Sequence, residues 1–122
     1  MKTIEILHKW EKYFNNQNLK DILNLYHPNS FLIPTFSSNI LLDHNGKKEY
    51  FIFLFKEQKG SVNIQNKSIV EQQIVEKVYL SIGNYIFCLS HGRKFSARFS
   101  FIFDTSVENP IKHHHSSQII EN

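Results

Sequence analysis

The sequence predicts an α+β fold in which three N-terminal helices pack on a curved antiparallel sheet. Two observations carry this prediction. Up to about residue 59, apart from a short β-prone segment, apolar residues recur every three or four positions, which is typical of amphipathic helices. After Gly60 they alternate with polar residues or form short apolar runs, as in strands. Helices followed by strands indicate an α+β arrangement rather than a parallel sheet.

The first two helices form a hairpin. The first is expected over about residues 1–16, with Trp10 turned toward the core, and polar residues end it. The second is expected over residues 19–26, where the apolar spacing repeats. Pro28 follows it, and the residue before a proline is disfavoured in a helix. The chain therefore begins with two short antiparallel helices.

A small β-hairpin and a third helix complete the first half. The β-prone runs 31–36 and 39–42 are parted by two serines, which predicts the hairpin. Asp43 or Asn45 can then cap a helix that continues to about Lys59, because their side chains accept hydrogen bonds from free helical N–H groups.

Four longer strands fit the second half as an antiparallel meander. They are expected at residues 62–75, 78–89, 95–103 and 111–119. A turn at Gly92 joins two of them, since glycine tolerates the positive φ that hairpin turns need. A sheet with helices on one face commonly curls into a cone with a pocket between the layers. We expect the functional residues at the mouth of that pocket.

The last two strands place residues on defined faces, since successive side chains of a strand point to opposite sides. On residues 95–103 one face carries Phe95, Ala97, Phe99, Phe101 and Phe103, and the other carries Ser96, Arg98 and Ser100. The phenylalanine face must pack on the helices or on a partner subunit. On the last strand one face carries Ile111, His113, His115 and Ser117, and the other carries Lys112, His114 and Ser116.

Composition narrows the class of protein. The 122 residues are expected to form one domain, residues 1–122. The 14 Lys and Arg against 11 Asp and Glu are scattered, whereas a nucleic-acid-binding protein would concentrate its cations. The longest apolar run is too short to span a membrane, and the N-terminus has no signal-peptide core, so a cytoplasmic location is expected. Cys88 is the sole cysteine and cannot form an intramolecular disulfide.

His113 and His115 are the candidate metal ligands. Two positions apart on a strand, they point the same way about 6.6 Å apart, so they can chelate one ion. Zinc normally takes a third protein ligand, and the sequence indicates none among the other histidines. A metal site and a polar strand end both stay open. The adjoining Ser116 and Ser117 follow no nucleophile elbow, which counts against a serine hydrolase.

Three further residues are ambiguous when taken singly. Arg98 is either solvated or an anchor for an anion, because its guanidinium is a rigid fork of donors suited to carboxylates. Thr35 alone would be an ordinary strand threonine. Tyr50 alone would be a core aromatic residue.

Four segments together resemble a known family. They are residues 31–37, 48–51, 96–101 and the terminal run 113–117 of three histidines and two serines. On these segments the chain resembles the iota-class carbonic anhydrases, within the superfamily of SnoaL-like proteins and calmodulin-dependent kinase II association domains. The similarity extends from about Trp10 to Ser117. It implies the cone-shaped fold of nuclear transport factor two.

The resemblance also implies a site and an activity. It places Thr35, Tyr50 and Ser117 around bicarbonate as catalytic residues, with Arg98 and His115 as substrate-binding neighbours. The expected activity is reversible hydration of carbon dioxide to bicarbonate. The resemblance further implies a homodimer that pairs through the open sheet face.

The cofactor stays open, because members of the family are described both as dependent on zinc or manganese and as metal-free. We expect no metal. If one is needed, the candidate ligands are His113 and His115, and bound water would then supply hydroxide.

Two other functions remain. The chain is alternatively a non-catalytic SnoaL-like module for oligomerisation or small-ligand binding, in which the polar groups of the pocket satisfy one another. A SnoaL-like isomerase or cyclase is the third option. The absence of Asp or Glu at an expected pocket position counts against it.

Overall fold

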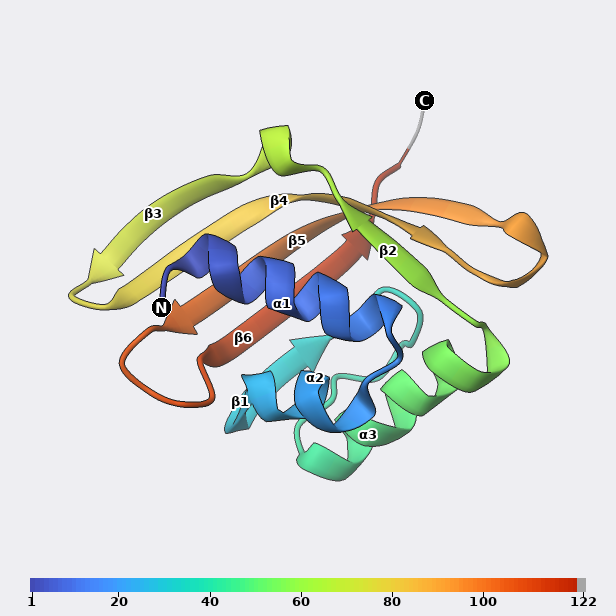
Figure 1. The fold of residues 1–122 in the computed structure, drawn as a ribbon, viewed down its shortest axis with the longest axis horizontal. Helices are drawn as coiled ribbons and strands as arrows, with labels where there is room; N and C mark the ends of the chain where they lie inside the picture. The colour runs from blue at the N-terminus through green and yellow to red at the C-terminus, as the bar shows by residue number, and fades with distance from the viewer. Residues whose placement is uncertain (121–122) are drawn as a thin grey trace.

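A bent six-stranded sheet carries three helices on one face in this computed structural model, which describes residues 1–120 (Figure 1). This arrangement confirms the predicted α+β class. The helices are α1 (Thr3–Asn15), α2 (Leu19–Leu25) and α3 (His44–Ile52), and the π-helical turn η1 (Phe53–Glu57) continues α3. The strands are β1 (Tyr26–Ile33), β2 (Ser61–Ile64), β3 (Val70–Val75), β4 (Val78–Cys88), β5 (Lys94–Asp104) and β6 (Ile111–Gln118). We call the helix-covered face of the sheet the inner face and the opposite one the outer face.

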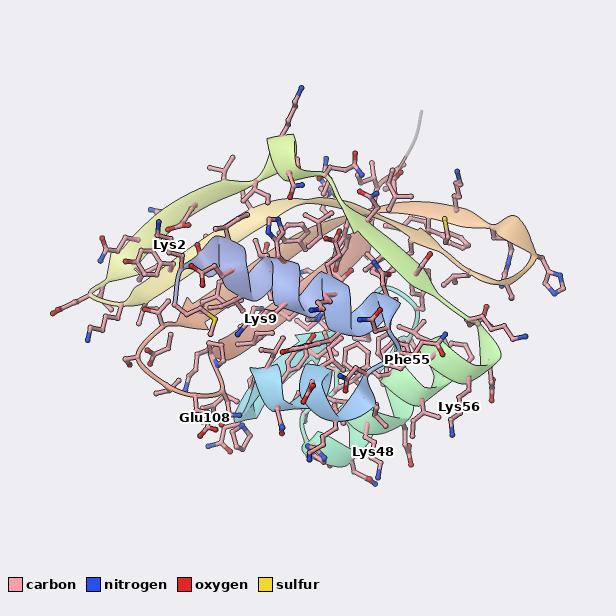
Figure 2. All side chains as sticks on the ribbon, viewed as in Figure 1. Lys2, Lys9, Lys48, Phe55, Lys56 and Glu108 are labelled. Carbon is pink, nitrogen blue, oxygen red and sulfur yellow. The ribbon has the colours of Figure 1, made fainter. Side chains whose placement is uncertain are left out.

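The helices pack on the sheet through the apolar stripe that predicted them. On α1, Ile6, Trp10 and Phe14 are each at most 1% exposed, and the helix lies across the inner face (Figure 1). The third helix is capped by Asp43, whose carboxylate accepts a hydrogen bond of 2.7 Å from the Gly46 N–H. Lys9, Lys48 and Lys56 are exposed on three different elements (Figure 2). Among the residues described, no helix is both long and apolar enough to span a membrane.

The strands are ordered β1-β6-β5-β4-β2, with β3 on the same edge of β4 as β2. Four pairings are antiparallel, as predicted, but β1 joins β6 in the parallel sense. The predicted hairpin of residues 31–36 and 39–42 is therefore wrong, and a single bridge between Leu32 and Leu41 remains of it. Pro34 has no amide hydrogen, so β1 ends before it and Thr35 lies in a turn.

The predicted strand 62–75 is two strands, because the 3₁₀ turn Asn66–Ser68 separates β2 from β3. The Ser68 hydroxyl accepts a hydrogen bond of 2.8 Å from the N–H of Asn84 in β4, which holds this turn against the sheet. Gly83 allows Phe99 to pack there, since a Cβ at Gly83 would lie 2.7 Å from the Phe99 ring. The expected turn before β5 is present, with His91 and Gly92 both at positive φ.

The phenylalanines of β5 face the helices. Phe99, Phe101 and Phe103 are at most 2% exposed and form the floor of the core. This resolves the alternatives left open by the sequence, because the helices rather than a partner subunit cover that face.

A β-bulge near the start of β6 changes which residues share a face. Phe103 pairs with Ile111 and Ile102 pairs with His113, so Lys112 is an extra residue in the ladder. Ile111 consequently lies on the inner face with His114 and Ser116. The prediction that Ile111 shares a face with His113, His115 and Ser117 is wrong, because strict alternation does not continue across a bulge.

Candidate functional site

His114 lies at the centre of a buried polar cluster on the inner face. It stands opposite Phe101 of β5 and beside Leu32 of β1. Its ring stacks on Phe101, with 3.9 Å between centroids and 18° between planes, and meets the Trp10 ring edge-on. The side chain is 3% exposed. Neighbouring aromatic rings therefore fix the orientation of the imidazole.

Both ring nitrogens of His114 contact tyrosine hydroxyls from other elements. The Tyr26 hydroxyl lies 2.8 Å from Nδ1, and the Tyr85 hydroxyl lies 3.1 Å from Nε2. The indole N–H of Trp10 donates to the Tyr26 hydroxyl at 3.0 Å. Residues from α1, β1, β4 and β6 thus form one hydrogen-bonded chain in a water-poor environment.

Burial keeps this cluster uncharged. It lowers the pKa of His114 well below its ordinary value, and the neighbouring His113 and His115 lower it further. Burial raises the pKa of Tyr26 and of Tyr85, although the hydrogen bond from Trp10 to Tyr26 and the proximity of the Ser116 hydroxyl to Tyr85 partly offset this. At neutral pH the imidazole is therefore neutral and the phenols keep their protons.

Three hydroxyls extend the cluster toward the surface. Ser116 and Thr35 share a short hydrogen bond between their side-chain oxygens. The Tyr50 hydroxyl accepts a hydrogen bond of 3.3 Å from the Phe36 N–H, and burial raises the pKa of Tyr50 above its ordinary value. Thr35 is only partly buried, so it forms the outward end of the cluster.

A small cavity adjoins these groups. Its polar wall consists of Tyr50, Tyr85, His114 and Ser116, and aromatic and aliphatic side chains form the rest. The cavity has about 10 Å³, which is at the lower limit for one water molecule. Beside it, the Phe36 ring packs edge-on against Phe87 and Phe95 at 5.2 and 5.3 Å. Only a very small ligand fits without displacing side chains.

The structure divides the sequence-predicted residues between two faces. Tyr50 lines the inner cavity, and Thr35 adjoins it through its hydrogen bond with Ser116. Arg98, His115 and Ser117 instead line an open hollow of about 430 Å³ on the outer face, where Arg98 pairs with Ser117 across the strands. The prediction that all five residues form one pocket is therefore wrong. Because the side chains of β6 alternate, Ser116 rather than Ser117 reaches Thr35.

Sequence reasoning missed Trp10, Tyr26, Tyr85, His114 and Ser116 as members of the site. A partial signal for two of them was present. The phenylalanine face of β5 must be buried, and in an antiparallel pair cross-strand neighbours share a face. The structure supplies the register, which places Ser116 and His114 opposite Phe99 and Phe101, so the sequence itself indicated only that one of the two faces of β6 is buried.

The residues present do not fit a three-ligand zinc or manganese site. His113 and His115 share the outer face, as their spacing predicts. Within residues 1–120, no group of three or more His, Cys, Asp or Glu side chains is arranged to hold a metal ion. A structural or catalytic zinc takes at least three protein ligands. The chemistry available at the inner site is therefore that of hydroxyl, indole and neutral imidazole groups.

Comparison with known proteins shows the fold. No protein-family model matches the sequence, and no curated protein gives a significant match. A Xanthomonas campestris structure described as a candidate calcium/calmodulin-dependent protein kinase II association domain is similar, with TM-score 0.82 and 23% identity. The match covers 95% of this chain and 84% of that one.

Two further structures have the same architecture. A candidate scytalone dehydratase from Novosphingobium aromaticivorans gives TM-score 0.80 at 6% identity, covering 95% of this chain and 80% of that chain. A protein of unknown function from Shewanella oneidensis, described as nuclear transport factor 2-like, gives TM-score 0.73 at 15% identity, covering 93% and 94%. The chain has the nuclear transport factor two-like fold.

Proposed function

We propose that the inner site catalyses reversible hydration of carbon dioxide to bicarbonate, with Thr35, Tyr50 and Ser116 as the residues around the substrate. The observation that carries this proposal is the cavity, which combines an apolar wall with several neutral hydroxyls. It has room for about one water molecule, so carbon dioxide enters as neighbouring side chains move apart. The apolar wall suits carbon dioxide, and the hydroxyls suit water and bicarbonate. The sequence resemblance to the iota-class carbonic anhydrases supports the same activity.

In the proposed reaction, a water oxygen bonds to the carbon of carbon dioxide and one proton leaves. Ser116 and Thr35 orient the water, and hydroxyl donors stabilise the negative charge that develops on the bicarbonate oxygens. His114 is a weak base because burial lowers its pKa, so the proton passes through the hydroxyls to solvent near Thr35. Ser116 takes the role that the resemblance assigned to Ser117, because Ser116 contacts Thr35.

A non-catalytic binding or oligomerisation module is the second candidate. One observation favours it: the polar groups already satisfy one another, since both ring nitrogens of His114 have tyrosine partners and Ser116 pairs with Thr35. The cavity is too small for a substrate that contains a ring, which disfavours an isomerase or cyclase.

A stopped-flow assay of carbon dioxide hydration on chelator-treated protein tests the proposal. We expect activity without added metal, reduced about tenfold or more in Tyr50→Phe, which loses one hydroxyl at the cavity. The matched control is Tyr79→Phe, since Tyr79 lies on β4 away from the cavity and should keep full activity. Activity that appears only with zinc or manganese would overturn the metal-free form. No activity with or without added metal would overturn the proposed activity and favour the non-catalytic binding or oligomerisation module.

A further inference from the structure

The direction of the buried hydrogen-bond chain follows from its donors. The Trp10 indole nitrogen can only donate, so the Tyr26 oxygen accepts the hydrogen bond between them. The Tyr26 hydroxyl is protonated and needs an acceptor of its own, because a buried O–H without a partner is costly. Within hydrogen-bonding distance it has His114 Nδ1, at 2.8 Å. Nδ1 must therefore carry a lone pair rather than a hydrogen.

The tautomer of His114 then determines the role of Tyr85. A neutral imidazole has one N–H, so His114 carries its hydrogen on Nε2. This N–H donates to the Tyr85 oxygen at 3.1 Å. Tyr85 is fully buried and lines the cavity, so its own hydrogen remains to be donated into the cavity, which Ser116 also lines.

We infer that the chain is polarised from Trp10 through Tyr26 and His114 to Tyr85, so that Tyr85 presents a hydrogen-bond donor to the cavity and the site selects an oxyanion. Tyr85 is the donor at the inner end of the cavity. Trp10 is a positioning residue, because it sets the tautomer of His114 without touching the ligand. The opposite direction would leave the Tyr26 hydrogen without an acceptor.

The nature of the ligand rests on the proposed function, whereas the direction of the chain does not. A site that offers donors binds bicarbonate or another small oxyanion through its oxygens. It rejects a small cation such as guanidinium, which brings only donors. The Trp10 indole on α1 thus determines the chemical class of the ligand indirectly, because it sets the tautomer of His114.

Nitrogen-15 NMR of the full chain tests the direction of the chain, because the two ring nitrogens of a neutral histidine differ widely in chemical shift. In the unsubstituted protein we expect His114 with a protonated Nε2 and an unprotonated Nδ1. Trp10→Phe, or Tyr26→Phe if the first variant does not fold, should give a mixture of tautomers. Tyr13→Phe removes a hydroxyl from the same helix outside the cluster and should leave the tautomer unchanged. A protonated Nδ1 in the unsubstituted protein would overturn the inference.

Titration with formate and with guanidinium tests the selection of ligands. We expect saturable shifts of the Ser116 amide with formate but not with guanidinium. Tyr85→Phe should weaken formate binding about tenfold or more, because it removes one hydrogen bond to an ion. Guanidinium binding as strong as formate would overturn the inference. If the tautomer and formate binding are as expected but the protein does not hydrate carbon dioxide, the proposed activity is wrong and the inference about the chain stands.

Discussion

The two faces of β6 carry the same kinds of residue in opposite environments. His114 and Ser116 face the helices and are 3% and 5% exposed, whereas His115 is exposed and Ser117 is partly exposed. The inner pair has hydrogen-bond partners on β1, on β4 and in the turn at Thr35. The outer pair borders an open hollow. Identical side chains one position apart therefore differ in burial, in their partners and in the chemistry available to them, and only the direction of the side chain separates them.

Substitution of the two histidines should show the largest difference between the faces. His114→Ala leaves the Tyr26 and Tyr85 hydroxyls short of a partner and removes the stack on Phe101. We expect a loss of about 3–5 kcal/mol in the free energy of unfolding, measured by chemical denaturation. His115→Ala should change it by less than about 0.5 kcal/mol. Equal losses would mean that the cluster contributes little to stability.

The two serines should separate activity in the same way. Ser116→Ala removes the hydroxyl that contacts Thr35, and a lost donor at a reacting oxygen costs about 100-fold in kcat. Ser117→Ala should hydrate carbon dioxide at the unsubstituted rate. The stopped-flow rates of both variants provide the measurement. Loss of activity in Ser117→Ala but not in Ser116→Ala would show that the site lies on the outer face.

Gly83 and Asn84 extend the comparison to packing. A Cβ at Gly83 would crowd the Phe99 ring, so Gly83→Ala should lower the free energy of unfolding by about 1–3 kcal/mol. Asn84→Ala changes a residue that borders the outer hollow and should have little effect. Thermal or chemical unfolding of the two variants gives the comparison, and equal stabilities would show that β4 moves to relieve the contact.

The pH dependence of the free energy of unfolding should show the contribution of the buried His114. The pKa of His114 is lowered in the folded protein. Below the ordinary histidine pKa of about 6.5, the unfolded chain therefore binds a proton at this residue and the folded chain does not. Stability is therefore retained above that pH and falls below it, by at most about 1.4 kcal/mol per pH unit. His113, whose pKa burial also lowers, adds a smaller part. The slope should survive in His115→Gln and decrease in His114→Gln, and a slope unchanged in both would assign it elsewhere.

Local patterns predict those parts of the fold that depend on neighbouring residues. The apolar spacing of α1 and the alternation of β5 are such patterns, and both elements are present where they are expected. The parallel pairing of β1 with β6 joins Leu32 to His114, far apart in the chain, and no local signal indicates it. The break between β2 and β3 depends on a contact of Ser68 with Asn84 in the next long strand, which the spacing of neighbouring residues does not indicate either.

The site was predictable only in part for the same reason. Thr35 and Tyr50 come from the resemblance; Tyr50 lines the cavity, and Thr35 contacts Ser116, which also lines it. Both faces of β6 carry histidine and serine, so composition does not show which face is buried. The tyrosines that hold His114 come from β1 and β4, and in the sequence alone Tyr26 and Tyr85 are ordinary apolar positions. Their role is visible only once the sheet brings three distant segments together.

The extra residue at Lys112 has a consequence for engineering the chain. Beyond this bulge, the pairing of β6 with β5 and β1 on its two sides determines which side chains point inward. The length of the connection over residues 105–110 does not determine it. We therefore expect that this connection can be lengthened, for example to carry a tag or a fused peptide, without rotating His114 and Ser116 out of the core. The bulge separates the geometry of the site from the length of the loop that precedes it.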